Sequence, residues 1–308
     1  MERQEIIKFE QIFDQLKGLV FWWILSSYSE HGAKSKFGRK KSMNLNFKRR
    51  LWSQNFFRDP RLVAQLVGQV NFGKTETVID IGAGTGIITE QLARRCKRVV
   101  AVEIDPELVA KLRARFQAVP EIEIQGGDFR QFELPRGKYK VFANIPFHIT
   151  SEIVYKLMYD TNPPEEAYLV LPKEAAEKFG GVPGETQFSI LAKPWFEMQT
   201  IRDLETFQFV PQPKANAVFW KLTKRNNPLV AAEEADLYRA FIKFAFNTWR
   251  KDLKVGLKRV FSYGQWKRLA RDNKFKVHTK PTELTFAQWL AVFRMFRSLE
   301  KERNNSQL

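Results

Sequence analysis

The sequence contains a single cysteine, Cys96, among its 308 residues. One thiol can form neither an internal disulfide nor a multi-cysteine zinc site. Histidine is also scarce, because only His31, His148 and His278 occur, far apart and without the spacing of metal ligands. We therefore expect no metal ion, and the low cysteine content fits the reducing cytoplasm.

Long apolar runs are missing as well. The run LVFWWIL at residues 19–25 is far shorter than the roughly 20 residues that a membrane span needs. The segment before it carries acidic residues, whereas a secretory signal begins with net positive charge. The sequence predicts neither an export signal nor a membrane partner.

Acidic residues are outnumbered. Lys and Arg total 51 against 34 Asp and Glu, which gives a net charge of +17. An excess of this size favours a polyanionic partner, with nucleic acid ahead of an anionic membrane; the alternative is a merely soluble basic protein. Because 44% of the residues are hydrophobic, the chain can still bury a substantial core.

Residues 1–43 are interpreted as an N-terminal extension. Apolar residues between positions 6 and 20 recur at steps of three and four, as in an amphipathic helix. A basic stretch follows at residues 34–50, with eight Lys and Arg and no acidic residue. This stretch suits either a nucleic-acid-binding arm, with Lys48, Arg49 and Arg50 as candidate RNA contacts, or a solvated linker.

Residues 44–225 alternate between short apolar runs and amphipathic segments. The runs that we predict as strands are 77–82, 98–105, 122–128, 139–145 and 166–172. The segments predicted as helices are 88–96, 106–116 and 151–159. This alternation indicates an α/β domain with a mostly parallel sheet and helices on both faces. Ligands of such sheets bind beyond the carboxyl ends of the strands.

Residues 226–300 have helical spacing throughout and are predicted to form a small all-α domain, followed by a flexible tail at 301–308. Between Arg239 and Lys280 there are 13 basic and two acidic residues, interleaved with aromatic side chains. We favour an RNA-facing surface over a plain solvated face. The candidate RNA contacts in this stretch are Arg250, Lys251, Lys254 and Lys258.

A glycine-rich turn, DIGAGTG at residues 80–86, follows the first of these strands and precedes a helix. Gly82 and Gly84 allow a tight turn and the close approach of a ligand. The turn matches neither the dinucleotide fingerprint nor a Walker loop. Glu103, at the end of the next strand, is placed to accept hydrogen bonds from a ribose, and Asp128 could bind an exocyclic amine. The combination suggests an adenosine cofactor such as S-adenosylmethionine; a plain tight turn is the alternative.

The tetrad Asn144-Ile145-Pro146-Phe147 ends the fourth strand. The side-chain oxygen of Asn144 and the backbone carbonyl of Ile145 could accept hydrogens from the amino group of a nucleobase. Pro146 restricts the preceding residue and so fixes the direction of that carbonyl, while Phe147 could stack on the base. By itself the tetrad suits a proline-stiffened turn with a core Phe equally well.

Five motifs together resemble the rRNA adenine N6-methyltransferases, the Erm and KsgA-type enzymes. They are SQNFF (53–57), DIGAGTG (80–86), VEID (102–105), GGDF (126–129) and NIPFHIT (144–150). The stretch FVPQPKANAVFWKL (209–222) resembles the family's connection between its last strands. The resemblance covers about residues 44–300.

This resemblance implies a Rossmann-like class I methyltransferase domain with a small helical C-terminal domain, and S-adenosylmethionine as the methyl donor. It places the target adenine at the tetrad, where Phe147 stands in place of the more usual Tyr. His148 is expected to shape the site or face RNA and not to act as a base. The residues that the resemblance assigns to the cofactor are Gln54, Asn55, Phe57, Gly82, Gly84, Glu103, Ile104, Asp128, Phe129 and Asn144.

Ser53, the Ile-Thr pair after His148 and the short C-terminal domain look more like Erm. Members of that branch methylate 23S rRNA and confer macrolide, lincosamide and streptogramin B resistance. The resemblance thus implies a monomeric, cytoplasmic 23S rRNA methyltransferase. The alternatives are a KsgA-type small-subunit rRNA dimethyltransferase, a DNA adenine methyltransferase and a non-catalytic RNA-binding factor.

Overall fold

The computed structural model describes residues 55–248 and 251–305, which fall into two compact units. The sheet unit comprises residues 55–177 and 196–226, and the helical unit comprises residues 178–195, 227–248 and 251–305. Several predicted features lie outside the described residues, namely the extension 1–43 and the residues Lys48, Arg49, Arg50, Gln54 and Arg250.

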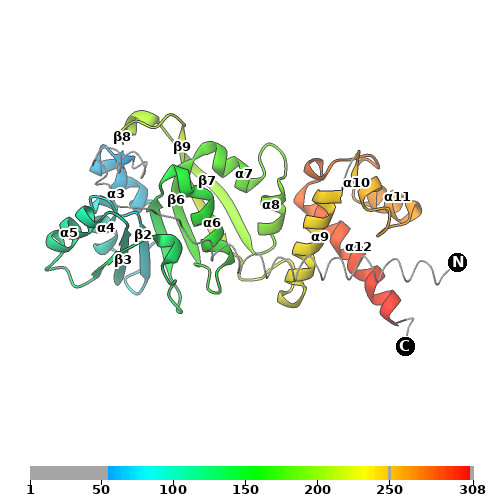
Figure 1. Cartoon of the computed structure of the whole chain (residues 1–308), viewed down its shortest axis with the longest axis horizontal. Coiled ribbons are helices and arrows are strands. Elements are labelled where there is room, and N and C mark those ends of the chain that lie inside the picture. Colours follow the sequence, from blue (N-terminus) through cyan, green and yellow to red (C-terminus); the bar gives the residue numbers. More distant parts are fainter. Residues whose placement is uncertain (1–54, 249–250, 306–308) are drawn as a thin grey trace, which may run out of the picture. The chain divides into compact units, whose positions relative to one another are not determined.

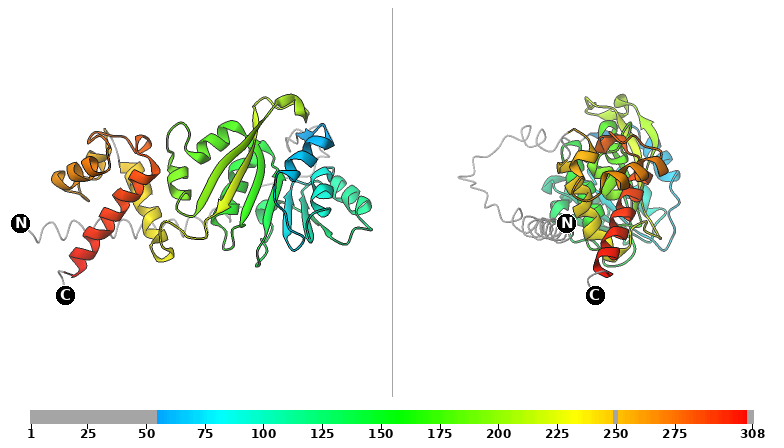
Figure 2. Two further views of the ribbon diagram at one scale, coloured as in Figure 1. Left: turned by 180° about the vertical axis from the view of Figure 1, so that it is seen from behind. Right: turned by 90° about the vertical axis from the view of Figure 1, so that its right-hand side faces the viewer.

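The sheet unit is built on seven strands in the order β4-β3-β2-β5-β6-β9-β7 (Figure 1). The strands are β2 (Thr77–Ile81), β3 (Arg98–Glu103), β4 (Ile122–Gly126), β5 (Lys140–Asn144), β6 (Glu166–Pro172), β7 (Phe196–Leu204) and β9 (Ala217–Lys224). Strands β2 to β6 pair in parallel, whereas β9 pairs antiparallel with both β6 and β7. Figure 2 shows the same sheet from behind. The predicted α/β, Rossmann-like architecture is confirmed.

The strand order explains where a ligand can bind. From β2 the chain moves outward through α4 (Ile87–Ala93) to β3, and through α5 (Pro106–Arg115) to β4. It then returns to β5 and proceeds the other way through α6 (Thr150–Tyr159) to β6. Right-handed crossovers in opposite directions place their helices on opposite faces. A crevice therefore opens where β2 and β5 end side by side.

Local sequence sets the helix starts. Asp105 accepts a hydrogen bond from Glu107 N and caps α5, with Pro106 at the first helical position. Asp59 and Pro60 begin α3 (Pro60–Gly68) in the same way. An Asp cap satisfies an otherwise unpaired N–H, and Pro needs no partner at the first position. Both helices are therefore fixed directly after segments that border the strand ends.

One apolar cluster covers one face of the sheet. Leu66 and Val67 of α3 and Leu92 of α4 pack with Val78 and Phe142 of the strands beneath them. All five side chains are essentially inaccessible to solvent. At about 25 cal/mol per Å² of buried apolar area, this packing is the main stabilisation of the layer.

The five predicted strands all occur, and β6 matches its predicted range at both ends. Helix α4 ends at Ala93, three residues before the predicted end at Cys96. The chain turns there because Arg95 N and Cys96 N donate to Leu92 O, and Lys97 N then joins Glu76 O next to β2. The turn delivers Arg98 to the start of β3.

The helical unit contains α8 (Gln187–Ala192), α9 (Ala235–Thr248), α10 (Leu253–Gly256), α11 (Tyr263–Asp272) and α12 (Phe286–Asn305), and α7 (Lys173–Gly180) spans the boundary in the sequence. Its core is strongly aromatic and includes Tyr238, Phe241, Trp266, Trp289, Phe293 and Phe296. Within the described residues, no helix has the length and apolar character of a membrane span.

Two features of the helical unit differ from the predicted boundaries. Residues 178–195 pack with this unit, although the predicted domain 44–225 would include them in the sheet unit. Helix α12 continues to Asn305, into the predicted flexible tail 301–308. The sequence between residues 286 and 305 contains neither Gly nor Pro, so nothing in it stops the helix at residue 300.

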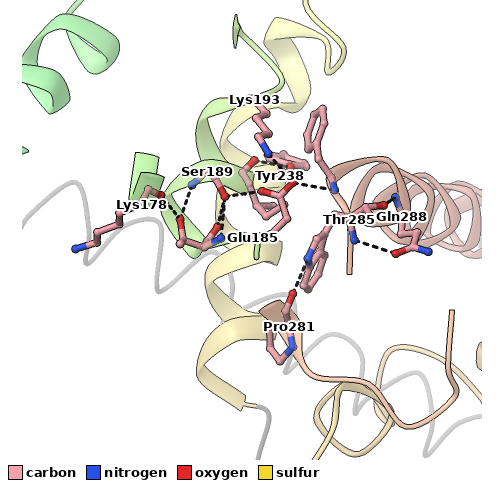
Figure 3. Close-up of polar contacts among 12 residues, drawn as sticks. Lys178, Glu185, Ser189, Lys193, Tyr238, Pro281, Thr285 and Gln288 are labelled. Carbon is pink, nitrogen blue, oxygen red and sulfur yellow. Dashed lines mark hydrogen bonds and ion pairs between the residues drawn. The ribbon is translucent and has the colours of Figure 1, made fainter. Parts of the chain in front are cut away.

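The carboxylate of Glu185 explains why residues 178–195 join the helical unit (Figure 3). One oxygen accepts from Lys193 Nζ at 2.5 Å and from the backbone N–H of Phe286, 101 residues away, at 3.2 Å. The other accepts from Ser189 Oγ at 2.6 Å. The pair with Lys193 is largely shielded from water. Glu185 thus fastens α8 to the start of α12.

We expect Glu185→Ala to lower the free energy of unfolding by about 2 kcal/mol, because it strands the shielded Lys193 ammonium and leaves the Phe286 N–H without its partner. Thermal unfolding followed by circular dichroism measures the effect. Glu174→Ala, an exposed carboxylate on α7, is the matched control and should change stability by less than about 0.5 kcal/mol. Equal midpoints for the two variants would contradict the role of Glu185.

Candidate active site at the ends of the parallel strands

A cavity of about 400 Å³ opens where β2 and β5 end. It lies wholly within the sheet unit, and its walls come from the turns after β2, β3, β4 and β5. The lining residues are Asn55, Phe56, Gly82, Glu103, Ile104, Asp128, Arg130, Asn144, Ile145, Pro146, His148 and Ile149. This is the position that doubly wound sheets offer to a ligand.

The glycine turn after β2 needs its glycines. Gly82, Gly84 and Gly86 all have positive φ angles, at 70°, 59° and 84°. A Cβ atom on Gly84 would lie only 2.6 Å from the ring of Phe56. The turn therefore combines a left-handed backbone with close contact to an aromatic side chain at the cavity wall.

Glu103 connects this turn to the next strand end. Its Oε2 accepts from Gly84 N at 2.8 Å, and its Oε1 accepts from Asp105 N at 2.9 Å. Burial raises the pKa of Glu103 although these hydrogen bonds oppose the rise. A carboxylate has about four acceptor positions. Glu103 can therefore hold both backbone groups and still accept from ligand hydroxyls in the cavity.

Asp128 lines the cavity beside Arg130. Its two oxygens accept from the Arg130 side chain at 2.6–3.1 Å, and one also accepts from Arg130 N. Hydrogen bonds from the Arg130 side chain hold the pKa of Asp128 below its ordinary value. Asp128 is therefore an ionised acceptor, and a ligand amine there would share it with a guanidinium that the sequence did not lead us to expect.

Asn144 is tied to the N-terminal segment of the unit. Its Nδ2 donates to the backbone carbonyl of Asn55 at 2.6 Å, 89 residues away. A carbonyl only accepts, so the amide must present nitrogen to Asn55. The side-chain oxygen of Asn144 is then left as an acceptor at the cavity.

The carbonyl of Ile145 is a second acceptor at the same wall. Ile145 N donates to Val170 O at 3.2 Å and continues the pairing between β5 and β6. The next donor on β6 in that ladder would be the N–H of residue 172, which is Pro172 and has none. The Ile145 carbonyl therefore lacks its ladder partner, and Pro146 holds the chain extended directly after it.

Three predicted aromatic contacts have other surroundings. Phe57 is buried, and its ring lies 5.0 Å from that of Phe209 in a stacked arrangement. Phe129 is also buried and stacks on Phe132. Neither lines the cavity, in contrast to the expected cofactor contacts; Phe56 does. Phe147 is half-buried and packs beside the cluster of α3.

The predicted residues thus divide into two groups. Asn55, Gly82, Glu103, Ile104 and Asp128 line one cavity together with Asn144, Ile145 and Pro146. Phe56, Arg130, His148 and Ile149 line it too and were not assigned to the cofactor or the chemistry. Phe56 adjoins Asn55 in the sequence, which is the signal that could have identified it. Lys251, Lys254 and Lys258 belong to the helical unit.

Asp80, the first residue of DIGAGTG, is fully buried beneath this site. Its Oδ2 accepts from Thr89 Oγ1 at 2.7 Å, whereas Oδ1 has no hydrogen-bond partner among the described residues. Burial raises the pKa of Asp80 to about 7, and the nearby Glu103 carboxylate adds to the rise. The group is therefore a neutral acid over much of the acidic range.

Comparison with known proteins settles the family. The ribosomal RNA adenine dimethylase family matches residues 45–298, which is most of the chain and contains every residue of the cavity. The chain belongs to this family. It is therefore an rRNA adenine methyltransferase, with S-adenosylmethionine as its methyl donor.

Relatives from both branches of the ribosomal RNA adenine dimethylase family are similar to the chain. The ribosomal RNA small subunit methyltransferase A of Caldanaerobacter subterraneus is 31% identical over 67% of this chain and 81% of that protein. An rRNA adenine N-6-methyltransferase of Bacteroides fragilis is 28% identical over 79% and 92%. The crystal structure of the 23S rRNA methyltransferase ErmE aligns with a TM-score of 0.73 and 25% identity, over 79% of this chain and all of ErmE.

The cavity fits the methyl donor of the family. An adenosine needs acceptors for its ribose hydroxyls and its amine, and the cavity offers the carboxylates of Glu103 and Asp128. The positive-φ glycines of the turn leave room for a ligand close to the backbone at Gly82.

We expect Asp80→Asn to flatten the pH dependence of stability. In the wild type the folded carboxyl titrates near 7 and the unfolded one near 3.8. The folded state therefore binds more protons between these values, and the free energy of unfolding falls as pH rises from about 4 to 7. Asparagine does not titrate, so the variant should gain stability relative to the wild type as pH rises.

Urea unfolding at pH 5, 6 and 7 measures this difference. The control is Glu107→Gln, an exposed carboxylate at the start of α5, which should follow the wild-type curve. Parallel pH profiles for Asp80→Asn and the wild type would show that Asp80 is ionised in the folded protein across this range.

Proposed function

We propose that this enzyme methylates the N6 amino group of an adenine in 23S rRNA and thereby confers macrolide, lincosamide and streptogramin B resistance. The observation that carries the chemistry is the pairing of Asn144 with Asn55, which turns the Asn144 side-chain oxygen into an acceptor beside the Ile145 carbonyl. Two acceptors at one wall suit an amino group that carries two hydrogens.

The cofactor is assigned to the strand ends. Glu103 accepts from its ribose, Asp128 from the adenine amine, and Gly82 borders the methionine part near Asn55. S-adenosylmethionine supplies a methyl group activated by its sulfonium. Phe56 takes the aromatic position that we had given to Phe57, because Phe56 lines the cavity and Phe57 belongs to the core.

The tetrad favours the geometry that N6 needs for attack. The lone pair of an aromatic amino group is delocalised into the ring, so the nitrogen is a poor nucleophile. Hydrogen bonds to Asn144 and to the Ile145 carbonyl favour a tetrahedral nitrogen, whose lone pair can then point at the methyl group. No basic side chain is needed for this step, and we assign His148 a shaping or RNA-facing role at the cavity rim.

Phe147 is assigned to the target base. It follows Pro146 directly, at the start of the 3-10 turn Phe147–Ile149, and is only partly buried, so part of its ring is available for stacking. A base in a helix must leave its stack to reach this position. Without a hydroxyl, Phe147 can only stack, whereas the Tyr of many relatives could also form a hydrogen bond.

The choice of 23S rRNA rests on likeness to ErmE over its whole length and on the motif details around SQNFF and NIPFHIT. A second candidate is dimethylation of small-subunit rRNA, which the 31% identity to a small subunit methyltransferase A supports. We further propose a monomer that works in the cytoplasm, and an RNA surface that includes Lys251, Lys254 and Lys258.

We expect Asn144→Ala to lower the rate of methyl transfer by at least about 100-fold, because it removes one of the two acceptors for the amino hydrogens. Binding of S-adenosylmethionine should remain measurable by calorimetry. Asn71→Ala, an exposed amide far along the sequence from the tetrad, should transfer methyl groups at the wild-type rate. A near-normal rate for Asn144→Ala would remove the tetrad from the mechanism.

Expression in a macrolide-sensitive bacterium tests the substrate. We expect growth in the presence of a macrolide and a new methyladenine in 23S rRNA, and neither with Asn144→Ala. Methyladenine in 16S rRNA alone would favour the small-subunit candidate. Label in duplex DNA alone would indicate a DNA methyltransferase, and RNA binding without any transfer would indicate a non-catalytic factor.

A further inference from the structure

A groove in the helical unit lies at the segment that joins α10 to α11 (Figure 1). Its volume is about 240 Å³, smaller than the 300 Å³ or more typical of drug-sized ligand sites. Leu257, Phe261 and Trp266 line it from the buried core. Lys254, Lys258, Ser262 and Tyr263 complete its lining. We call this feature the Tyr263 groove.

Tyr263 is unusually exposed for an aromatic residue, at 62% of its surface. The other large aromatic residues of the two flanking segments, Phe261 and Trp266, are almost fully buried. The Nζ atom of Lys254 lies 5.7 Å from the centre of the Tyr263 ring. The groove thus presents an aromatic surface next to a cation.

Lys254 is held in place from its other side. Its Nζ lies 3.5 Å from Nε2 of His278, and Nδ1 of His278 lies 2.6 Å from Oδ2 of Asp252. Asp252 also accepts from Val255 N and caps α10. With the His278 proton on Nδ1, the ring donates to Asp252 and accepts from Lys254. The ammonium is thereby oriented at the groove.

The charge around the groove selects its ligand. Residues 251–280 contain ten Lys and Arg and only two acidic residues, Asp252 and Asp272. Both carboxylates are already engaged, Asp252 by His278 and Asp272 by Arg271. The ligand is therefore anionic, and the exposed aromatic ring requires that it also has a flat face. A nucleotide has both properties.

We propose that the Tyr263 groove binds one unstacked nucleotide of single-stranded RNA, with its base on the Tyr263 ring and its phosphate at Lys254 and Lys258. The inference rests on the proposed function only in taking RNA as the substrate. Duplex RNA cannot use the site in this way, because its bases are stacked on one another. The groove therefore distinguishes single-stranded from paired RNA, at a site separate from the methyl-transfer cavity.

Fluorescence anisotropy with a labelled single-stranded oligoribonucleotide tests the proposal in the full-length protein. We expect Tyr263→Ala to weaken binding roughly tenfold, as the loss of one base–aromatic stack does, and Tyr263→Phe to bind within about twofold of the wild type. Lys254→Gln should lower affinity and reduce the slope of log Kd against log salt by about 0.7.

The controls are Phe207→Ala, which removes an equally exposed ring (63%) from the sheet unit, and Lys111→Gln, which removes an exposed lysine there. Neither should change binding. The proposal fails if Tyr263→Ala binds the oligonucleotide as the wild type does with an unchanged thermal midpoint, or if duplex RNA binding is weakened equally. Because binding is measured without methyl transfer, a 16S target would overturn the 23S assignment and leave this result standing.

Discussion

The carboxylate of Glu103 accepts one backbone N–H from the glycine turn after β2 and another from the residue that caps α5. These two hydrogen bonds fix the ends of neighbouring parallel strands against each other. The turn can stay in its left-handed conformation because Gly84 is held there, and Phe56 packs directly against it. The cavity wall on this side therefore depends on one buried acid, whose remaining acceptor positions face the ligand.

The other wall depends on a backbone that is left incomplete. Asn144 donates to Asn55 and keeps its oxygen for a substrate, and Pro172 offers no N–H to the Ile145 carbonyl. Both acceptors remain available because their usual protein partners are either satisfied elsewhere or missing. Unpaired acceptors are costly in a protein interior, and here they border a cavity in which a substrate amine can pair with them.

The sequence identified the strand-end residues because apolar runs that end in polar side chains mark the same edge of a parallel sheet. It could not separate Phe56 from Phe57, because that choice depends on the pairing of Phe57 with Phe209, some 150 residues later. The placement of residues 178–195 likewise depends on the contact between Glu185 and Phe286. The Arg130 side chain on Asp128 is also set by local three-dimensional geometry. Distant or conformational contacts of this kind leave no periodic signal.

The central claim is that the cavity transfers a methyl group to adenine N6 of 23S rRNA. Nucleoside mass spectrometry of 23S rRNA after incubation with the enzyme and isotope-labelled S-adenosylmethionine tests it most directly. The proposed mechanism predicts label in N6-methylated adenosine at a single site of 23S rRNA. Label in any other nucleoside, or no label in 23S rRNA while 16S rRNA is labelled, would contradict it.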